Sequence, residues 1–130
     1  MRKLFLALVL CTLFIAGFFM VILHKMYRQH ENNITIQVNE SDDQYRFYAS
    51  FSRFKTRAIQ NYIDAQLNTN HLFRNAKIDA DVTLPDHTSI YVKSFPGILE
   101  IKLDKEKNDM VSYNKIKALG EQLKIRLAGN

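Results

Sequence analysis

Apolar and polar positions divide this chain into one long apolar run and a following region of shorter, alternating segments. In residues 4–23, 18 of 20 residues are hydrophobic, none is charged, and only Thr12 and Gly17 interrupt the run. A helix of twenty residues is roughly 30 Å long, which matches the hydrocarbon core of a bilayer. The pattern predicts a transmembrane helix over residues 4–23, after a short basic N-terminus (1–3) and before a polar connector (24–33).

A cleaved leader is the alternative for this segment. Arg2 and Lys3 provide the basic start of a signal peptide, but the apolar region of such a peptide is normally about 7–15 residues long. Bulky Phe14 and Ile15 also occupy positions where a cleavage site would need a small residue. We therefore expect an uncleaved signal anchor, and we interpret Cys11 as an apolar filler of the helix.

The charges that flank the run are nearly balanced. Arg2, Lys3 and the amino terminus lie on one side, and Lys25 and Arg28 lie on the other. Because so few residues precede the span, we expect the N-terminus in the cytoplasm and residues 24–130 outside it, in a periplasmic or extracellular position.

Beyond the connector, the spacing of apolar residues predicts five strands and two helices within residues 34–128. Alternation is typical of strands with one buried face, and a spacing of three and four residues is typical of helices. The expected strands have their apolar positions at Ile34, Ile36 and Val38; at Tyr45, Phe47, Ala49 and Phe51; at Ala76, Ile78, Ala80, Val82 and Leu84; at Ile90 and Val92; and at Leu99, Ile101 and Leu103. The expected helices have theirs at Phe54, Ala58, Ile59, Tyr62, Ile63 and Leu67, and at Val111, Ile116, Leu119, Leu123 and Leu127.

Turn-forming residues separate these elements. The cluster 39–43 joins the first two strands in an antiparallel hairpin, 68–70 ends the first helix, and 85–87 and 95–97 are turns. The candidates for the N-cap of the second helix are Asn108, Asp109 and Ser112. The order ββαβββα predicts a single α+β domain with an antiparallel sheet covered on one face by two helices.

Composition narrows the class of protein. The chain has 130 residues, with four Gly, two Pro and one Cys. This composition excludes collagen-like, low-complexity and disulfide-stabilised proteins. Its net charge of +5 is typical of nucleic-acid binding, but Arg2, Lys3, Lys25 and Arg28 supply four of those charges. Residues 31–130 contain 14 bases and 13 acids, so nucleic acid is not an expected partner.

The sequence contains no spacing typical of a nucleophile elbow, a P-loop, a dinucleotide site or a zinc site. We therefore expect no cofactor and no bound metal, and the absence of a catalytic motif disfavours an enzyme without excluding one. A weak alternative is a polar site formed by Asp79, Asp81, Asp86 and His87, if the fold brings them together. Otherwise the first two belong to the solvated face of a strand and the last two belong to a turn.

Residues 45–57 interleave cations with aromatic residues and contain no acid. The cations are Arg46, Arg53, Lys55 and Arg57, and the aromatic residues are Tyr45, Phe47, Tyr48, Phe51 and Phe54. The phenylalanines are also explained as core positions of a strand and a helix. Three of the cations crowd the start of the first predicted helix, where the helix dipole favours an anion instead.

By an up-and-down count of the successive elements, the fifth strand brings Lys102, Lys105 and Lys107 to the same end as the start of the first helix. That end would face the membrane, where anionic head groups attract each nearby base by about 1 kcal/mol. The expected contacts with an anion or a lipid surface are Arg53, Lys55, Arg57, Lys105 and Lys107. An ordinary solvated basic face is the alternative.

These features favour a single-pass membrane protein that displays a small extracytoplasmic α+β domain for binding an unknown protein or surface partner. The alternatives are a small membrane-tethered enzyme or ligand-binding module with a pocket between sheet and helices, and a secreted domain after leader cleavage. Convergent polar side chains in a deep pocket would favour the enzyme or ligand-binding module. A shallow surface with an exposed strand edge would favour the protein-binding domain.

Overall fold

The computed structural model describes residues 3, 15–25, 33–74 and 77–129, and its chain divides into two units, Met1–Asn32 and Asn33–Asn130. In the first unit, residues 15–25 are helical. None of the helices in the described ranges is long and apolar enough to cross a bilayer. Residues 4–14, which include Cys11 and more than half of the expected span, lie outside those ranges, so the transmembrane helix stays a prediction.

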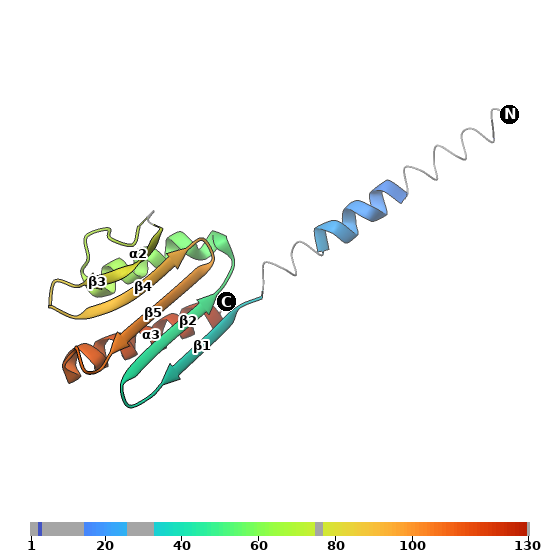
Figure 1. Cartoon of the computed structure of the whole chain (residues 1–130). Helices are drawn as coiled ribbons and strands as arrows, with labels where there is room; N and C mark the ends of the chain where they lie inside the picture. Colours follow the sequence, from blue (N-terminus) through green and yellow to red (C-terminus); the bar gives the residue numbers. More distant parts are fainter. Residues whose placement is uncertain (1–2, 4–14, 26–32, 75–76, 130) are drawn as a thin grey trace. The chain divides into compact units, whose positions relative to one another are not determined.

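The second unit is the predicted α+β domain (Figure 1). Its strands are β1 (Thr35–Glu40), β2 (Gln44–Ser50), β3 (Ile78–Thr83), β4 (Ser89–Phe95) and β5 (Ile98–Asp104). A 3-10 turn, η1 (Arg53–Lys55), precedes helix α2 (Thr56–Leu67), and helix α3 (Met110–Ala128) follows β5. The strands form one antiparallel sheet in the order β1-β2-β5-β4-β3.

Figure 1 shows both helices on the same side of this sheet. The inward positions of β2 and β5 alternate with outward ones, as the sequence predicts, and the inward side chains pack against both helices. The central buried side chains are Tyr45, Phe47, Ala49, Ile63, Phe73, Val92, Leu99, Ile101, Leu103, Ile116, Leu123 and Leu127. Of the three N-cap candidates, Asp109 caps α3, because its side chain accepts a hydrogen bond of 2.8 Å from the backbone N–H of Ser112.

Several expected core positions are exposed. Phe54 is 68% exposed because it lies in η1, before α2 begins, so the spacing of the helix does not apply to it. Val111 is exposed because Ser112, not Val111, faces the core from the first turn of α3. Val38 and Ala80 lie on the two edge strands, which have only one neighbouring strand each. Ala76, expected in the third strand, lies outside the described residues.

Asp64 organises the connection that follows α2. Its carboxylate accepts hydrogen bonds from the hydroxyl of Thr69 at 2.6 Å and from the backbone N–H groups of Phe73 and Arg74 at 3.0 Å each. Asn68 ends the helix in the left-handed conformation, with φ of 54°. The connection buries Phe73 completely and brings the chain to Ile78, which lies opposite Ser94 near the end of β4.

This connection decides the direction of the later strands. Ser50, where β2 ends, lies between Thr35 at the start of β1 and Ile98 at the start of β5. At the other end of the sheet, Gln44 lies opposite Asp104, where β5 ends. Strand β5 therefore runs in the same direction as β1.

The expectation that Lys102, Lys105 and Lys107 lie at the same end as the start of α2 is therefore wrong. The up-and-down count fails because the connection after α2 brings the chain back before β3 begins, so that the five strands alternate in direction and β5 runs in the same direction as β1. The last strand consequently ends beside the acidic turn 40–43, where the backbone N–H of Lys105 donates to the carbonyl of Asp43 at 2.8 Å.

Candidate functional site

A basic patch lies at the end of the sheet where β1 and β5 begin. We define this patch by Arg53, Phe54, Lys55 and Arg57. The guanidinium of Arg53 lies 5.3 Å from the centroid of the Phe54 ring. Within the described ranges, no carboxylate lies within 4.0 Å of the charged nitrogens of the three cations. The patch therefore presents uncompensated positive charge around an exposed aromatic ring.

The turn between β4 and β5 holds the backbone of this patch in place. The carbonyl of Gly97 accepts a hydrogen bond of 2.9 Å from the N–H of Phe51, and its N–H donates to the hydroxyl of Thr56 at 2.8 Å. Gly97 has φ of 79°, and a Cβ there would lie 2.7 Å from the carbonyl oxygen of Phe51. Only glycine permits this close approach, so η1 is fastened on both sides of Phe54.

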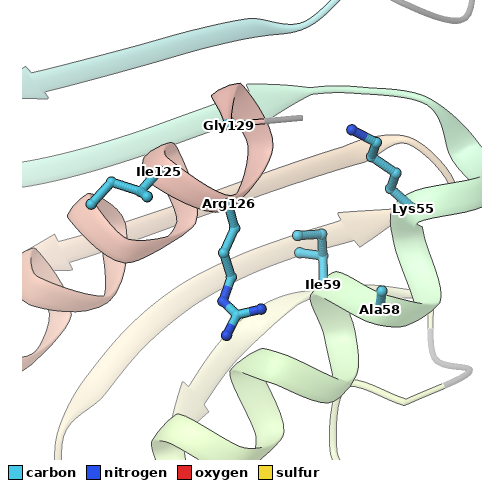
Figure 2. Close-up of a pocket in the computed structure, with 6 residues that line it drawn as sticks. All are labelled: Lys55, Ala58, Ile59, Ile125, Arg126 and Gly129. Carbon is cyan, nitrogen blue, oxygen red and sulfur yellow. The ribbon is translucent and has the colours of Figure 1, made fainter.

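A surface hollow between the start of α2 and the end of α3 adjoins the patch (Figure 2). It is lined by Lys55, Ala58, Ile59, Ile125, Arg126 and Gly129. Figure 2 shows Arg126 extending from α3 into the space between the two helices. Its guanidinium lies 3.8 Å from the centroid of the Tyr62 ring, and the neighbouring Ile125 is 62% exposed. Apolar side chains thus form part of a hollow that has a cation on either side.

Arg126 is a component of this end that the sequence pattern did not identify. Its position in the last turn of the final helix is visible in the sequence, but the end of the sheet that this turn reaches depends on the direction of β5. We define the basic end of the domain as the basic patch together with Arg126.

The opposite end of the sheet carries a cluster centred on Glu40. Its carboxylate accepts hydrogen bonds from the hydroxyl of Tyr113, from Lys105 Nζ at 3.1 Å and from Lys117 Nζ at 3.2 Å. These hydrogen bonds, that of Tyr113 foremost, lower the pKa of Glu40 to about 2. Lys105 also donates to the carbonyl of Ser41 at 2.7 Å. Lys105 is therefore paired with the acidic turn, far along the sheet from Arg53.

The open face of the sheet is covered by paired charges and aromatic rings. Glu100 forms salt bridges with Arg46 at 2.9 Å and with Lys102 at 3.1 Å. Although burial raises the pKa of Glu100, these hydrogen bonds lower it below its usual range. Arg46 and Lys102 also lie over the rings of Tyr48 and Tyr91, at 5.6 and 5.0 Å from their centroids. A hollow on this face is lined by Gln44, Asp81, Val82, Thr83, Ser89, Ile90, Tyr91, Lys102, Asp104 and Lys107.

The four residues of the weaker, polar candidate site are not assembled into one cluster. Asp79 accepts a hydrogen bond of 2.6 Å from the hydroxyl of Tyr91, which raises the pKa of Tyr91 to about 12. Asp86 pairs with Lys115, whose hydrogen bond lowers the pKa of Asp86 to about 2. Asp81 is exposed on the open face.

The fourth residue of that candidate, His87, is exposed in the turn before β4, with φ of 69°. Within the described part of the chain, no hydrogen bond or ion pair joins any two of the four. The described residues also contain no group of three or more His, Cys, Asp or Glu side chains suited to a metal ion.

The two edge strands differ in the charge that they present. β3 carries Asp79 and Asp81, whereas β1 has no charged residue before Glu40 at its end. Val38 in β1 is 39% exposed. A charged edge discourages pairing with another strand, so β1 is the less protected of the two edges.

Comparisons of this chain with family models, with curated proteins and with solved structures give no significant match. The function must therefore be inferred from the residues of the chain itself.

Proposed function

We propose that the chain is a single-pass, membrane-anchored protein that displays a small α+β interaction domain outside the cytoplasm. The observation that carries the proposal is the contrast between two parts of the chain. Residues 4–23 are apolar and uncharged, whereas the unit Asn33–Asn130 contains the whole described hydrophobic core. A domain that is complete by itself has no need of the apolar run for folding, which favours a separate role for that run in the membrane.

The character of the domain surface supports a binding role. Charges on the open face of the sheet, such as Glu100 and Arg46, pair with one another instead of converging on a cavity. Strand β1 also offers an exposed edge. Such an edge suits the addition of an extended segment from a protein partner.

A ligand-binding module is the second candidate function. The polar hollow on the open face brings Asp81, Tyr91 and Lys102 to one surface. Asp81→Asn changes the lining of this hollow, and Asp86→Asn is the control outside it. If Asp81→Asn loses the binding of a small molecule that Asp86→Asn still binds, the result favours a ligand-binding module over the protein-binding domain.

Topology is tested with single cysteines in full-length protein produced in bacterial cells. Because Cys11 is the only cysteine, Cys11→Ser provides a background in which Val111→Cys reports on the domain and Arg2→Cys on the N-terminus. We expect a membrane-impermeant maleimide to label Val111→Cys in intact spheroplasts and Arg2→Cys only after the membrane is permeabilised. The reverse pattern would contradict the proposed orientation.

Anchoring is tested separately by carbonate extraction and by the intact mass of the mature protein. We expect the protein to remain in the membrane pellet with its N-terminal segment present. Release into the carbonate supernatant, or loss of about twenty N-terminal residues, the length of a typical leader, would replace the anchor with a secreted domain.

A further inference from the structure

Charge is strongly separated along the strand direction of the domain. The acidic end has the carboxylates of Glu40, Asp42, Asp43, Asp86, Asp104, Glu106 and Asp109, and these outnumber the lysines at the same end, Lys105, Lys107, Lys115 and Lys117. The segments at the basic end, residues 49–60, 95–99 and 122–129, contain no Asp or Glu. Among the described residues, the basic end therefore carries cations without nearby carboxylates, whereas carboxylates outnumber cations at the other end.

Phe54 gives this surface a second property. Its ring is 68% exposed although η1 is fastened by the neighbouring turn, so the exposure is set by the backbone. An exposed aromatic ring among Arg and Lys side chains suits the boundary between head groups and acyl chains, where aromatic side chains reside and cations reach phosphates. The adjoining hollow between Lys55 and Arg126, with exposed Ile125, extends the same combination of apolar area and positive charge.

The basic end of the domain is also the end that the connector joins. β1 begins at this end, and the connector of ten residues before it spans at most about 33–36 Å. The acidic end lies a further strand of six residues away, roughly 20 Å. The connector therefore enters the domain at its basic end.

We propose that the basic end of the domain docks on an anionic lipid surface, with the Phe54 ring entering the interface and Arg53, Lys55, Arg57 and Arg126 contacting head-group phosphates. Its orientation in the cell rests on the proposed membrane anchor, but the lipid affinity belongs to the domain alone. The partner is therefore a membrane leaflet that contains phosphatidylglycerol or another anionic lipid.

The experiment uses a fragment of residues 33–130, which retains every described core residue. The chain has no tryptophan, so Phe54→Trp introduces a single fluorescent reporter in the patch. Vesicles contain phosphatidylcholine alone or with about one-third phosphatidylglycerol. We expect a blue shift of the emission, and quenching by lipids that carry a nitroxide on the acyl chain, with the anionic vesicles only. Val111→Trp, at the acidic end, is the matched reporter and should respond to neither vesicle.

Co-sedimentation of the unsubstituted fragment measures affinity without any change near Phe54. Replacing Arg53, Lys55 and Arg57 with Gln should weaken binding to anionic vesicles about a hundredfold, because each of the three lost charges contributes a factor of about ten or less to the affinity. Replacing Lys93, Lys107 and Lys115 with Gln removes the same charge elsewhere and should weaken binding less than threefold. Circular dichroism establishes that each variant is folded.

Three results would overturn the proposal: equal binding to neutral and anionic vesicles, equal losses in the two triple variants, or a stronger response of Val111→Trp than of Phe54→Trp. A shift of Phe54→Trp emission by inorganic phosphate alone, equal to that with vesicles, would assign the surface to a soluble anion instead. Failure of the anchor in carbonate extraction would leave the vesicle result unchanged, so the two proposals are tested independently.

Discussion

A methyl group on Gly120 would lie 2.1 Å from the hydroxyl oxygen of Tyr45 and 3.2 Å from its ring carbon Cζ. Tyr45 is completely buried, and within the described part of the chain its hydroxyl has no hydrogen-bond partner. Burial also raises the pKa of Tyr45 to about 12, so the hydroxyl stays neutral. Helix α3 therefore approaches β2 this closely only because residue 120 lacks a side chain.

Gly120→Ala should destabilise the domain by about 1–3 kcal/mol, because the overpacking exceeds the gain of roughly 1 kcal/mol in helix propensity. Tyr45→Phe removes an unpaired buried hydroxyl and should be neutral or stabilising. The double variant should recover much of the loss, since the 2.1 Å contact is removed and the ring carbon Cζ, 3.2 Å from the new methyl group, needs to shift by only a few tenths of an ångström. Urea unfolding of the four proteins measures this cycle, and additive effects of the two changes would contradict the contact.

Asp64→Asn should lower the free energy of unfolding by about 1–3 kcal/mol, because a charged acceptor of three hydrogen bonds becomes an amide that satisfies fewer of them. Asp81→Asn, on the exposed sheet face, is the matched control and should change stability by less than about 0.5 kcal/mol. Urea unfolding midpoints provide the comparison. Equal effects of the two changes would show that Asp64 does not hold the segment that follows α2.

Glu40 should make the domain less stable in acid. Its pKa is about 2 in the folded protein and near 4.5 ordinarily, so its contribution is complete above about pH 5 and is lost as the pH falls towards 2. Glu40→Gln should therefore be less stable than the parent at pH 7, with the difference shrinking to nothing near pH 2. Thermal unfolding across this range measures the difference. Glu106→Gln, an exposed change of the same charge, is the control, and a constant difference for Glu40→Gln would contradict the assignment.

Replacing Phe73 with alanine should lower the free energy of unfolding far more than replacing Phe54. Phe73 is completely buried, and Phe73→Ala should cost about 3–5 kcal/mol. Phe54 is mostly exposed, and Phe54→Ala should change stability by less than about 0.5 kcal/mol. Denaturant unfolding distinguishes them. A large loss of stability in Phe54→Ala would mean that its ring packs in the core, as the spacing of apolar residues had suggested.

The alternation of apolar residues predicted the strands of this domain because each strand has one face towards the helices. The inward set of β2, from Tyr45 to Ala49, is read directly from that alternation. The same rule failed for Val38, since an edge strand has neighbours on one side only. It also missed Phe73, which lies in a connection without a repeating pattern. The carboxylate of Asp64 holds that connection by accepting hydrogen bonds from the backbone N–H groups of Phe73 and Arg74.

The candidate site was predicted only in part for a related reason. Arg53, Lys55 and Arg57 stand close together in the sequence, so their clustering was visible. The pairing of Lys105 with Glu40 joins residues 65 positions apart, and the contribution of Arg126 depends on where α3 ends. Both follow from strand direction, which a local pattern does not contain.

The segment between α2 and β3 therefore sets the electrical polarity of the domain as well as its topology. Because it returns the chain before β3, β5 delivers Asp104 to the end that already holds Glu40, and α3 brings Arg126 back to the other end. With the opposite strand directions, the acids of residues 104–109 would lie beside Arg53 and neutralise it. The domain consequently has an electric dipole along its strands, and an applied electric field would align it in that direction.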